Sequence, residues 1–260
     1  MLCMLLGAAL GLLVAVFGLG GVIGAQVVYI RLFLIALCML AGVVLGRLLS
    51  AVWATVRLRK LNGILYGRCD PEAFLGAFEK VAKNVPAGTV EQVDAQTKIA
   101  YACEALGKVD EGLRAMEGLK PRELKLHALQ CTALVENQRM RLYLLGEDAE
   151  AASSQLTVLE ELQQVAEKRA PALGTQLGEC VRLGRCWLNI LLDEECDLDY
   201  IRSQIAASQN RIHKAEMQLL LGYALRSCGL DLDSREAFVG AAETAPDLYA
   251  AKRAKQELGI

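Results

Sequence analysis

Acidic side chains are missing from the first quarter of the chain. The sequence has 260 residues and 30 Asp and Glu, yet the first of these is Asp70, and no charged side chain precedes Arg31. Residues 1–60 carry five cations, which leaves 23 Lys and Arg against 30 Asp and Glu, a net −7, for the remainder. The chain therefore divides near residue 60 into an apolar segment and an acidic, polar one. We expect no nucleic-acid binding, because phosphate neutralisation needs a clustered basic face.

Signatures of catalysis, metal binding and nucleotide binding are also missing. The sequence contains no GxxxxGK[ST], GxSxG, HExxH or CxxC, and no GxGxxG that opens a strand–helix unit. Of the two histidines, His127 lies four residues before Cys131 and His213 lies three before Glu216, but no second pair of ligands follows either. We therefore expect no catalytic residues, no metal and no cofactor, and interpret the protein as a non-enzyme.

The nine cysteines do not form a recognisable disulfide framework. Their number is odd, and most lie within apolar helical patterns, where a free thiol behaves as a small hydrophobic side chain. We expect buried free thiols in a reducing compartment.

Long hydrophobic runs are present only at the N-terminus. Residues 2–23 and 32–56 form two such runs, and each exceeds the roughly 20 apolar residues that cross a bilayer. We expect a transmembrane hairpin over residues 1–57, with one span plus a re-entrant or interfacial helix as the fallback. Glycines spaced four apart favour close packing within the hairpin, with self-association into a homo-oligomer as the alternative. These glycines are Gly7, Gly11, Gly20, Gly24, Gly42 and Gly46.

Cations after the second run predict a topology. Arg57, Arg59 and Lys60 flank that run, whereas the opposite loop offers only Arg31. The positive-inside rule then places the rest of the chain on the cytoplasmic side. We expect an integral protein with two spans, in what we take to be a bacterial cytoplasmic membrane. Residues 58–69 would form a basic linker and residues 70–260 a cytoplasmic domain.

Residues 70–260 carry helix signals without strand alternation. Asp70-Pro71 is a strong helix start, and Thr89 with Gln92 has the spacing of a capping box. Aromatic residues make up only 5% of the chain, and strong helix formers such as Ala and Leu dominate. We place one helix from Pro121 to about residue 136 and a longer one from about residue 140 to 169. The predicted fold class is all-α.

The clearest internal unit covers residues 215–248 and reads AEMQLLLGYALRSCGLDLDSREAFVGAAETAPDL. It resembles a tetratricopeptide repeat (TPR), with Gly222 in the first helix, Gly229 at the turn, Phe238 and Ala241 on the second helix, and Pro246 before the next. Two departures are Ser234 at the usual small residue and Gln218 at the usual aromatic one. Residues 93–121 match more weakly, with Gly112 in place of Ala, and residues 121–210 match poorly.

The resemblance implies an α-solenoid of antiparallel helix pairs, whose concave side usually binds a partner. The positions that would face this groove are Asp94, Thr97, Tyr101, Glu104, Glu216, Leu219, Tyr223 and Arg226. The alternative is that they are ordinary helix-surface residues or lie under a neighbouring helix.

A membrane-anchored interaction module or scaffold is the function that these features favour. Its partners would be proteins at or in the membrane, besides the lipid bilayer itself. The first alternative is a structural or regulatory subunit of a membrane complex, assembled through the glycine-rich hairpin. A less favoured alternative is an enzyme with an unrecognised helical site.

Overall fold

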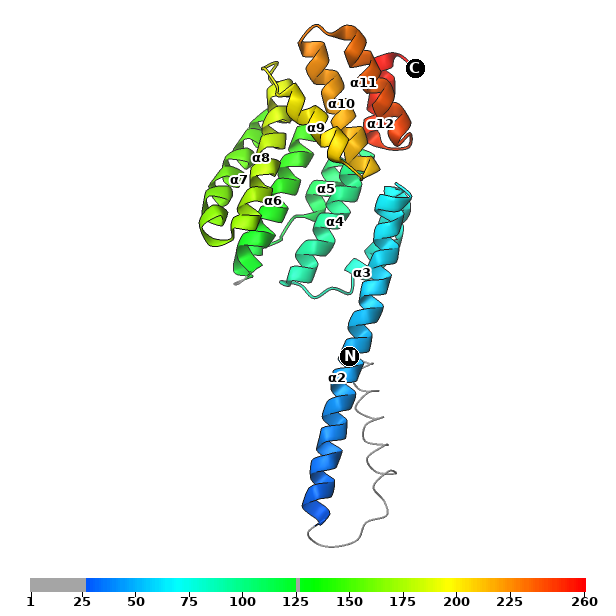
Figure 1. Ribbon diagram of the computed structural model, residues 1–260, viewed down its shortest axis with the longest axis vertical. Coiled ribbons are helices and arrows are strands. Elements are labelled where there is room, and N and C mark those ends of the chain that lie inside the picture. Colours follow the sequence, from blue (N-terminus) through cyan, green and yellow to red (C-terminus); the bar gives the residue numbers. More distant parts are fainter. Residues whose placement is uncertain (1–26, 125–126) are drawn as a thin grey trace. The chain divides into compact units, whose positions relative to one another are not determined.

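The computed structural model describes residues 27–124 and 127–260. It divides the chain into two compact units, Met1–Leu61 and Asn62–Ile260. Within the described residues every regular element is a helix and no strand occurs, which confirms the all-α prediction (Figure 1).

The described part of the first unit is one long helix, α2, which covers Val27–Asn62. It contains the second hydrophobic run and many exposed apolar side chains, among them Leu40 at 64% and Trp53 at 66% exposure. Arg59 and Lys60 lie in its last turn, where cations favour the negative end of the helix dipole. The guanidinium of Arg57 lies 5.5 Å from the centre of the Trp53 ring.

The predicted localisation in a membrane is wrong for the part of the chain that the structure describes. No helix over residues 27–124 and 127–260 is long and apolar enough to cross a bilayer. In α2 only 15 residues separate Arg31 from Arg47. At 1.5 Å per residue they extend about 22 Å, which falls short of the roughly 30 Å of a hydrocarbon core. The topology inferred from Arg57, Arg59 and Lys60 assumed that the preceding residues span the membrane, so it has no basis once that span is wrong.

The first predicted span lies outside the described residues, and so do four of the glycines predicted to pack in the hairpin, Gly7, Gly11, Gly20 and Gly24. Gly42 and Gly46 lie within α2. The predicted linker at 58–69 is mostly helical, since α2 continues to Asn62 and a π-helical turn, η1, covers Gly63–Gly67.

The second unit is a succession of helices joined by short turns. In chain order they are α3 (Pro71–Ala82), α4 (Val90–Leu106), α5 (Val109–Ala115), η2 (Pro121–Glu123), α6 (Ala128–Leu145), α7 (Ala149–Arg169), α8 (Pro171–Leu191), α9 (Leu198–Ala207), α10 (Arg211–Ser227), α11 (Asp231–Thr244) and α12 (Tyr249–Leu258).

Local signals set several of these boundaries. Asp70 caps α3, since its carboxylate accepts a hydrogen bond from the Ala73 N–H at 2.9 Å. Thr89 caps α4 by accepting from the Gln92 N–H at 3.2 Å. The Gln92 side chain reaches back to the Gly88 N–H at 2.8 Å, one residue before the donor that a capping box would use. Both predicted helix starts are confirmed.

The predicted helix break between residues 136 and 140 is wrong. Helix α6 continues through this region to Leu145, and the turn comes at residues 146–148. Asp148 then starts α7 by accepting from the Ala151 N–H at 3.0 Å. Gln138 in this region is buried and donates to Glu104 of α4, so it does not mark a surface turn.

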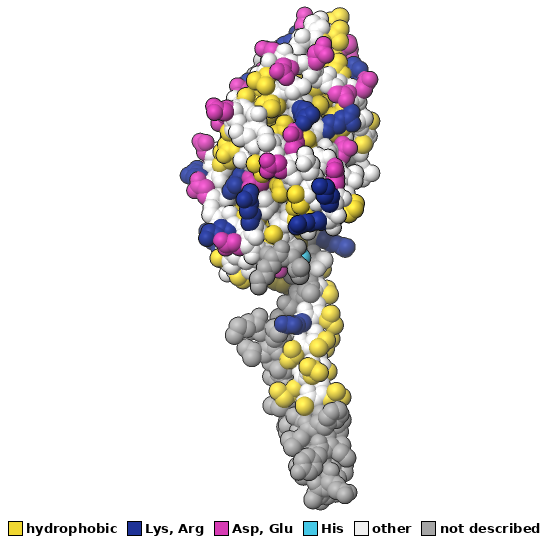
Figure 2. Space-filling view, turned by 90° about the vertical axis from the view of Figure 1, so that its left-hand side faces the viewer, with side chains coloured by type: hydrophobic (Ala, Val, Ile, Leu, Met, Phe, Trp, Pro, Cys, Tyr) yellow, Lys and Arg dark blue, Asp and Glu magenta, His cyan; other side chains and the backbone are white. Residues whose placement is uncertain are grey.

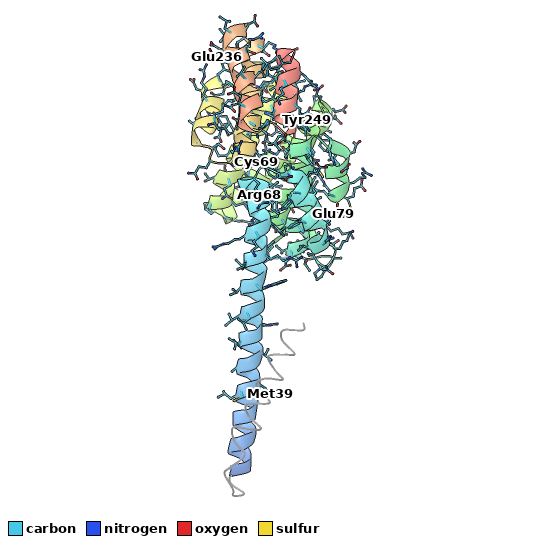
Figure 3. The ribbon with its side chains drawn as sticks, turned by 90° about the vertical axis from the view of Figure 1, so that its right-hand side faces the viewer. Met39, Arg68, Cys69, Glu79, Glu236 and Tyr249 are labelled. Carbon is cyan, nitrogen blue, oxygen red and sulfur yellow. The ribbon has the colours of Figure 1, made fainter. Side chains whose placement is uncertain are left out.

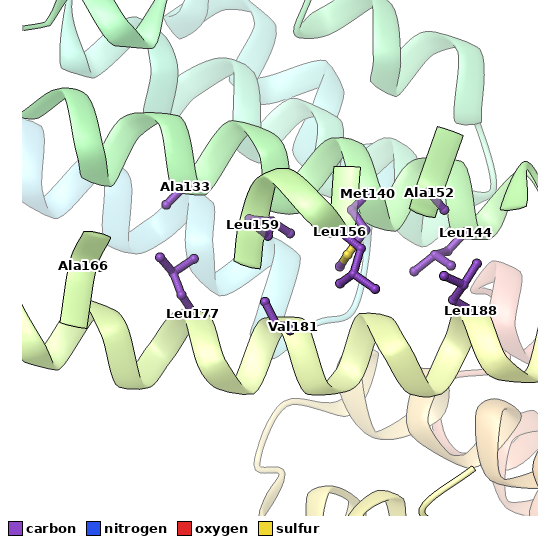
Figure 4. Close-up of a cluster of buried hydrophobic side chains, with 10 residues drawn as sticks. All are labelled: Ala133, Met140, Leu144, Ala152, Leu156, Leu159, Ala166, Leu177, Val181 and Leu188. Atoms are coloured by element: carbon purple, nitrogen blue, oxygen red, sulfur yellow. The ribbon is translucent and has the colours of Figure 1, made fainter. Parts of the chain in front are cut away.

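Apolar side chains from α6, α7 and α8 form the largest of the described core clusters (Figure 4). Leu156, Leu159 and Ala166 project from α7 toward Leu177 and Val181 of α8 and toward α6. The apolar side chains of α7 therefore pack within the helical array.

Alternate helices of the second unit form an inner ring. Each of α4, α6, α8, α10 and α12 contacts the next in that order, and α12 returns to contact α4. Helices α5, α7, α9 and α11 follow them in the chain as outer partners. Side by side, α10, α11 and α12 form the C-terminal end of this arrangement (Figure 1). An open solenoid would keep its first and last inner helices apart, so the ring closure is a feature that the repeat pattern did not predict.

Candidate binding site on the inner helices

An ion network occupies the centre of the ring. Arg141 of α6 lies between Glu104 of α4 and Glu216 of α10. Its guanidinium is 2.6 Å from one carboxylate oxygen of Glu104 and donates to Glu216 at 2.9 Å. Gln138, one turn earlier in α6, donates its side-chain N–H to the other Glu104 oxygen at 2.6 Å. The Arg141 guanidinium therefore forms ion pairs with two carboxylates, which come from two other helices.

Burial sets the electrostatics of this network. Glu104 and Glu216 are only 3% and 7% exposed. Desolvation raises the pKa of Glu104 above its usual range, although Arg141 opposes the shift. Desolvation also acts on Glu216, but Arg141 and His213 outweigh it and leave the pKa of that carboxyl lowered. The pKa of Arg141 is raised, because the two carboxylates outweigh its own desolvation.

Tyr101 extends the network along α4. Its ring centre lies 5.9 Å from the Arg141 guanidinium, and its hydroxyl accepts a hydrogen bond from the Asn210 side chain at 3.3 Å. Burial, with help from Glu216, raises the pKa of Tyr101 well above its ordinary value. Asn210 also caps α10 by accepting from the Ile212 N–H, so the network is tied directly to the start of that helix.

Small cavities lie beside these charges. The first has a volume of about 60 Å³ and a mostly apolar lining that includes Leu145, Trp187, Leu219 and Tyr223. The second, of about 50 Å³, lies between Trp187 and the Glu104–Arg141 pair. Trp187 lines both, and its buried Nε1 has no hydrogen-bond partner among the described residues. The inner face therefore carries one largely apolar cavity and a second cavity whose lining includes the charged side chains of Glu104 and Arg141.

The rim of the first cavity is formed by α12 and the turn before α7. Arg253 of α12 donates to the Glu147 carboxylate at 3.0 Å and to the Tyr223 hydroxyl at 3.0 Å. Glu147 is held with φ of 59°, in the left-handed region that side chains with a Cβ rarely adopt. Tyr249, at the start of α12 (Figure 3), lines the same cavity and packs on Gly107 of α4. Any Cβ at Gly107 would lie 2.2 Å from that ring.

Of the eight residues predicted to face a groove, three lie in the ion network, two line the first cavity and three make other contacts. Tyr101, Glu104 and Glu216 come together in the ion network, while Leu219 and Tyr223 line the first cavity. The other three contact helix neighbours. Asp94 pairs with Lys98, Thr97 donates to the Val93 carbonyl, and Arg226 pairs with Glu257 of α12.

The sequence-based search missed Arg141, Gln138, Trp187, Tyr249 and Arg253. The first three belong to residues 121–210, where the repeat pattern is weakest. One signal was available, because Gln138 and Arg141 are three residues apart and so share a helix face that also bears the buried Leu142 and the half-buried Leu145. Polar side chains at that spacing within a buried helix indicate an internal polar contact.

Charge on the outer surface is mixed. On the face shown in Figure 2, Lys and Arg side chains alternate with Asp and Glu over the second unit. Across residues 27–124 and 127–260, no group of three or more His, Cys, Asp or Glu side chains could hold a metal ion. Comparison with protein-family models, curated proteins and solved structures finds no match to this chain.

Proposed function

We propose that residues 62–260 form a protein-interaction module of TPR-like helix pairs. In this module the first cavity of the inner face receives an apolar anchor side chain from a partner protein. The observation that carries the proposal is the cavity itself, which is largely apolar, lies on the inner helices and has a charged rim. Binding sites of this kind combine an apolar hollow with a few polar groups that orient the ligand.

Helix pairing of the TPR kind is supported by close approaches at two glycines. A Cβ on Gly222 of α10 would lie 2.4 Å from the Phe238 ring of α11. Ser234 also donates to the Gly222 carbonyl at 2.8 Å, which fixes the same pair of helices. In the weaker repeat, a Cβ on Gly112 of α5 would lie 2.8 Å from the Leu142 side chain of α6. Small residues therefore stand where neighbouring helices come closest.

The size of the cavity limits the anchor. Its volume of about 60 Å³ is several times the roughly 10–15 Å³ that one water needs. An aliphatic side chain of about four carbons, such as that of leucine, fits this space. The charged rim adds a second requirement for the partner. Arg253 pairs with Glu147 at the surface, where both side chains are partly exposed, so it can exchange the Glu147 carboxylate for a carboxylate of the partner. We propose a partner segment with a branched aliphatic residue next to an acidic one.

The experiment is peptide selection against the full-length chain, followed by affinity measurement on the enriched peptides by fluorescence anisotropy. We expect enriched peptides to share a Leu or Ile beside an Asp or Glu. Leu145→Trp fills the cavity from its half-buried wall and should weaken binding at least tenfold. Val239→Trp on the exposed face of α11 is the matched control and should leave the affinity unchanged.

Circular dichroism and thermal melting of both tryptophan variants are the control for correct folding. Enriched peptides without a shared aliphatic residue would overturn the proposal, and so would equal affinities for Leu145→Trp and Val239→Trp. Catalytic turnover by the purified chain would replace it with the enzyme alternative.

A further inference from the structure

Two thiols meet where α8 turns into α9. Cys186 lies in α8 and is 6% exposed, while Cys196 lies ten residues later, just before Asp197, the cap of α9. Cys196 is half-buried. Neither residue belongs to the ion network or lines the cavities described above, so this pair is independent of the proposed function.

Two side-chain clamps hold the thiols opposite each other. Arg182, Cys186 and Asn189 are spaced four and three residues apart, so they share one face of α8. Asn189 donates to the Glu195 carbonyl at 2.8 Å, and Arg182 donates to the Asp197 carboxylate at 2.6 Å. The residues on both sides of Cys196 are thereby fixed to positions on both sides of Cys186. The two clamps therefore hold Cys196 beside the face of α8 that carries Cys186.

The hydrogen bonds make the two thiols unequal. The Cys196 S–H donates to the Cys186 sulfur, which also accepts the Asp197 backbone N–H at the start of α9. These donors lower the pKa of Cys186 to about 7. Donation to Cys186 raises the pKa of Cys196 well above its ordinary value. Cys186 is therefore the more acidic thiol of the pair, and the thiolate that it forms is the nucleophilic form of cysteine.

Other described cysteines have the opposite character. Burial raises the pKa of Cys103 to about 11 and also raises the pKa of Cys131 and of Cys180. Cys228 is exposed and lies at the end of α10, away from the clamps. Only the Cys186–Cys196 pair combines an adjacent second thiol with hydrogen-bond donors among the residues that the structure describes.

We propose that Cys186 and Cys196 form a reversible, hydroperoxide-sensitive disulfide. The Cys186 thiolate attacks one oxygen of the hydroperoxide, the O–O bond breaks, and the other oxygen leaves as water or alcohol after protonation. The resulting Cys186 sulfenic acid is then attacked by Cys196, which forms the S–S bond and releases water. Two thiols and one hydroperoxide thus give one disulfide, one water and one water or alcohol. A dithiol reductant reverses the change by exchange.

Charged groups around the pair come from both helices. Arg182 favours the Cys186 thiolate, and the Asp197 carboxylate opposes it. The Tyr200 hydroxyl of α9 also interacts with Cys186, but burial raises its pKa far above neutrality, so it stays uncharged.

Mass spectrometry of the full-length chain tests the proposal. The chain is treated with hydrogen peroxide, its free thiols are blocked with N-ethylmaleimide, and it is digested with trypsin. Cleavage after Arg185 and Arg202 yields a single peptide, residues 186–202, that contains both cysteines. We expect this peptide to lose two hydrogens and to escape the maleimide, while Cys228 is still labelled. Dithiothreitol should restore the labelling of both cysteines.

Single substitutions separate the two roles. In Cys196→Ser the sulfenic acid of Cys186 has no resolving thiol, so dimedone should trap it. Cys196→Ala removes the S–H donor and puts no hydroxyl in its place, so alkylation of Cys186 by iodoacetamide at pH 7 should slow on the order of tenfold as its pKa returns toward about 8.5. Cys228→Ser is the matched control and should change neither result.

Three outcomes would overturn the proposal. One is a fully maleimide-labelled peptide 186–202 at a peroxide dose that already oxidises Cys228. Another is a link from either cysteine to a different one. The last is an alkylation rate of Cys186 that is the same in Cys196→Ala and in the unmodified chain.

Discussion

The apolar cluster between α6, α7 and α8 and the ion network between α4, α6 and α10 share one helix but differ in chemistry. One face of α6 presents Met140 and Leu144 to α7 and α8. Another presents Arg141 and Gln138 to carboxylates of other helices. Apolar packing tolerates many partners of similar size, whereas a buried carboxylate needs a donor in one place. The comparison indicates that the cluster stabilises the array and the network specifies how the inner helices meet.

Breaking the network at its cation should have the largest effect. Arg141→Met leaves two buried carboxylates without their shared partner, so we expect a loss of about 3–5 kcal/mol in the free energy of unfolding, measured with urea. Arg185→Met is the control, because Arg185 pairs with Glu160 at the surface and should cost at most about 1 kcal/mol. Equal losses in the two variants would show that the network is not energetically distinct.

A triple variant sharpens the same comparison. Replacing Glu104 and Glu216 with Gln in the Arg141→Met background removes both unpaired charges. Most of the lost stability should then return, because breaking one partner of a buried ion pair costs more than replacing the whole set. A triple variant as unstable as Arg141→Met alone would place the loss in packing rather than in charge.

Truncation in the apolar cluster should cost somewhat less. Leu159 is fully buried in α7, and Leu159→Ala leaves a cavity, so we expect a loss of about 3 kcal/mol by urea unfolding. Leu134→Ala removes the same atoms from a side chain that is 41% exposed and should cost no more than about 0.5 kcal/mol. Similar losses at both positions would argue against a tightly packed cluster.

The glycine contact between α10 and α11 should come next. Gly222→Ala places a Cβ against the Phe238 ring, and the overpacking should cost about 2 kcal/mol, measured as a lower melting temperature and urea midpoint. Combining it with Phe238→Leu should recover part of the loss, because the smaller side chain makes room. Gly76→Ala is the control, since nothing lies within 4 Å of its added Cβ. No recovery in the double variant would contradict the close approach.

The smallest effect is expected at the rim of the cavity. Glu147 has a left-handed backbone and an exposed ion pair with Arg253. Glu147→Gly loses the pair but relieves the backbone, so its stability should change by less than about 1 kcal/mol. Glu147→Ala loses the pair without relief and should be less stable than the glycine variant by about 1 kcal/mol. Thermal melting of the two variants makes the comparison, and a more stable alanine variant would refute it.

Local signals predicted the second unit well where the cause of the structure was local. The starts of α3 and α4 follow from Asp70 and Thr89, because capping needs only residues a few positions away. The close pairing of α10 and α11 was likewise visible in Gly222 and Phe238. The break near residue 138 was misplaced, because the partners of Gln138 and Arg141 lie on α4 and α10, far away in the sequence.

The candidate site was predicted in part for the same reason. Tyr101, Glu104 and Glu216 were selected as groove-facing positions and do lie on inner helices, but the network fills the space between those helices. The span predicted over residues 32–56 is wrong for the residues that the structure describes, among which no helix is long and apolar enough to cross a bilayer. The count of apolar residues gave too little weight to Arg47, which together with Arg31 limits the apolar length of α2.

The sequence by itself determined that residues 70–260 are helical, where several helices begin and that α10 pairs with α11, since propensity, capping and small residues act over one or two turns. Only the tertiary structure decided that α12 returns to α4, that Arg141 pairs with two carboxylates, and that Cys196 is held beside the face of α8 that carries Cys186. The physical reason is that buried charges and thiols acquire their partners from whichever helices pack around them, and that choice is made by the whole array.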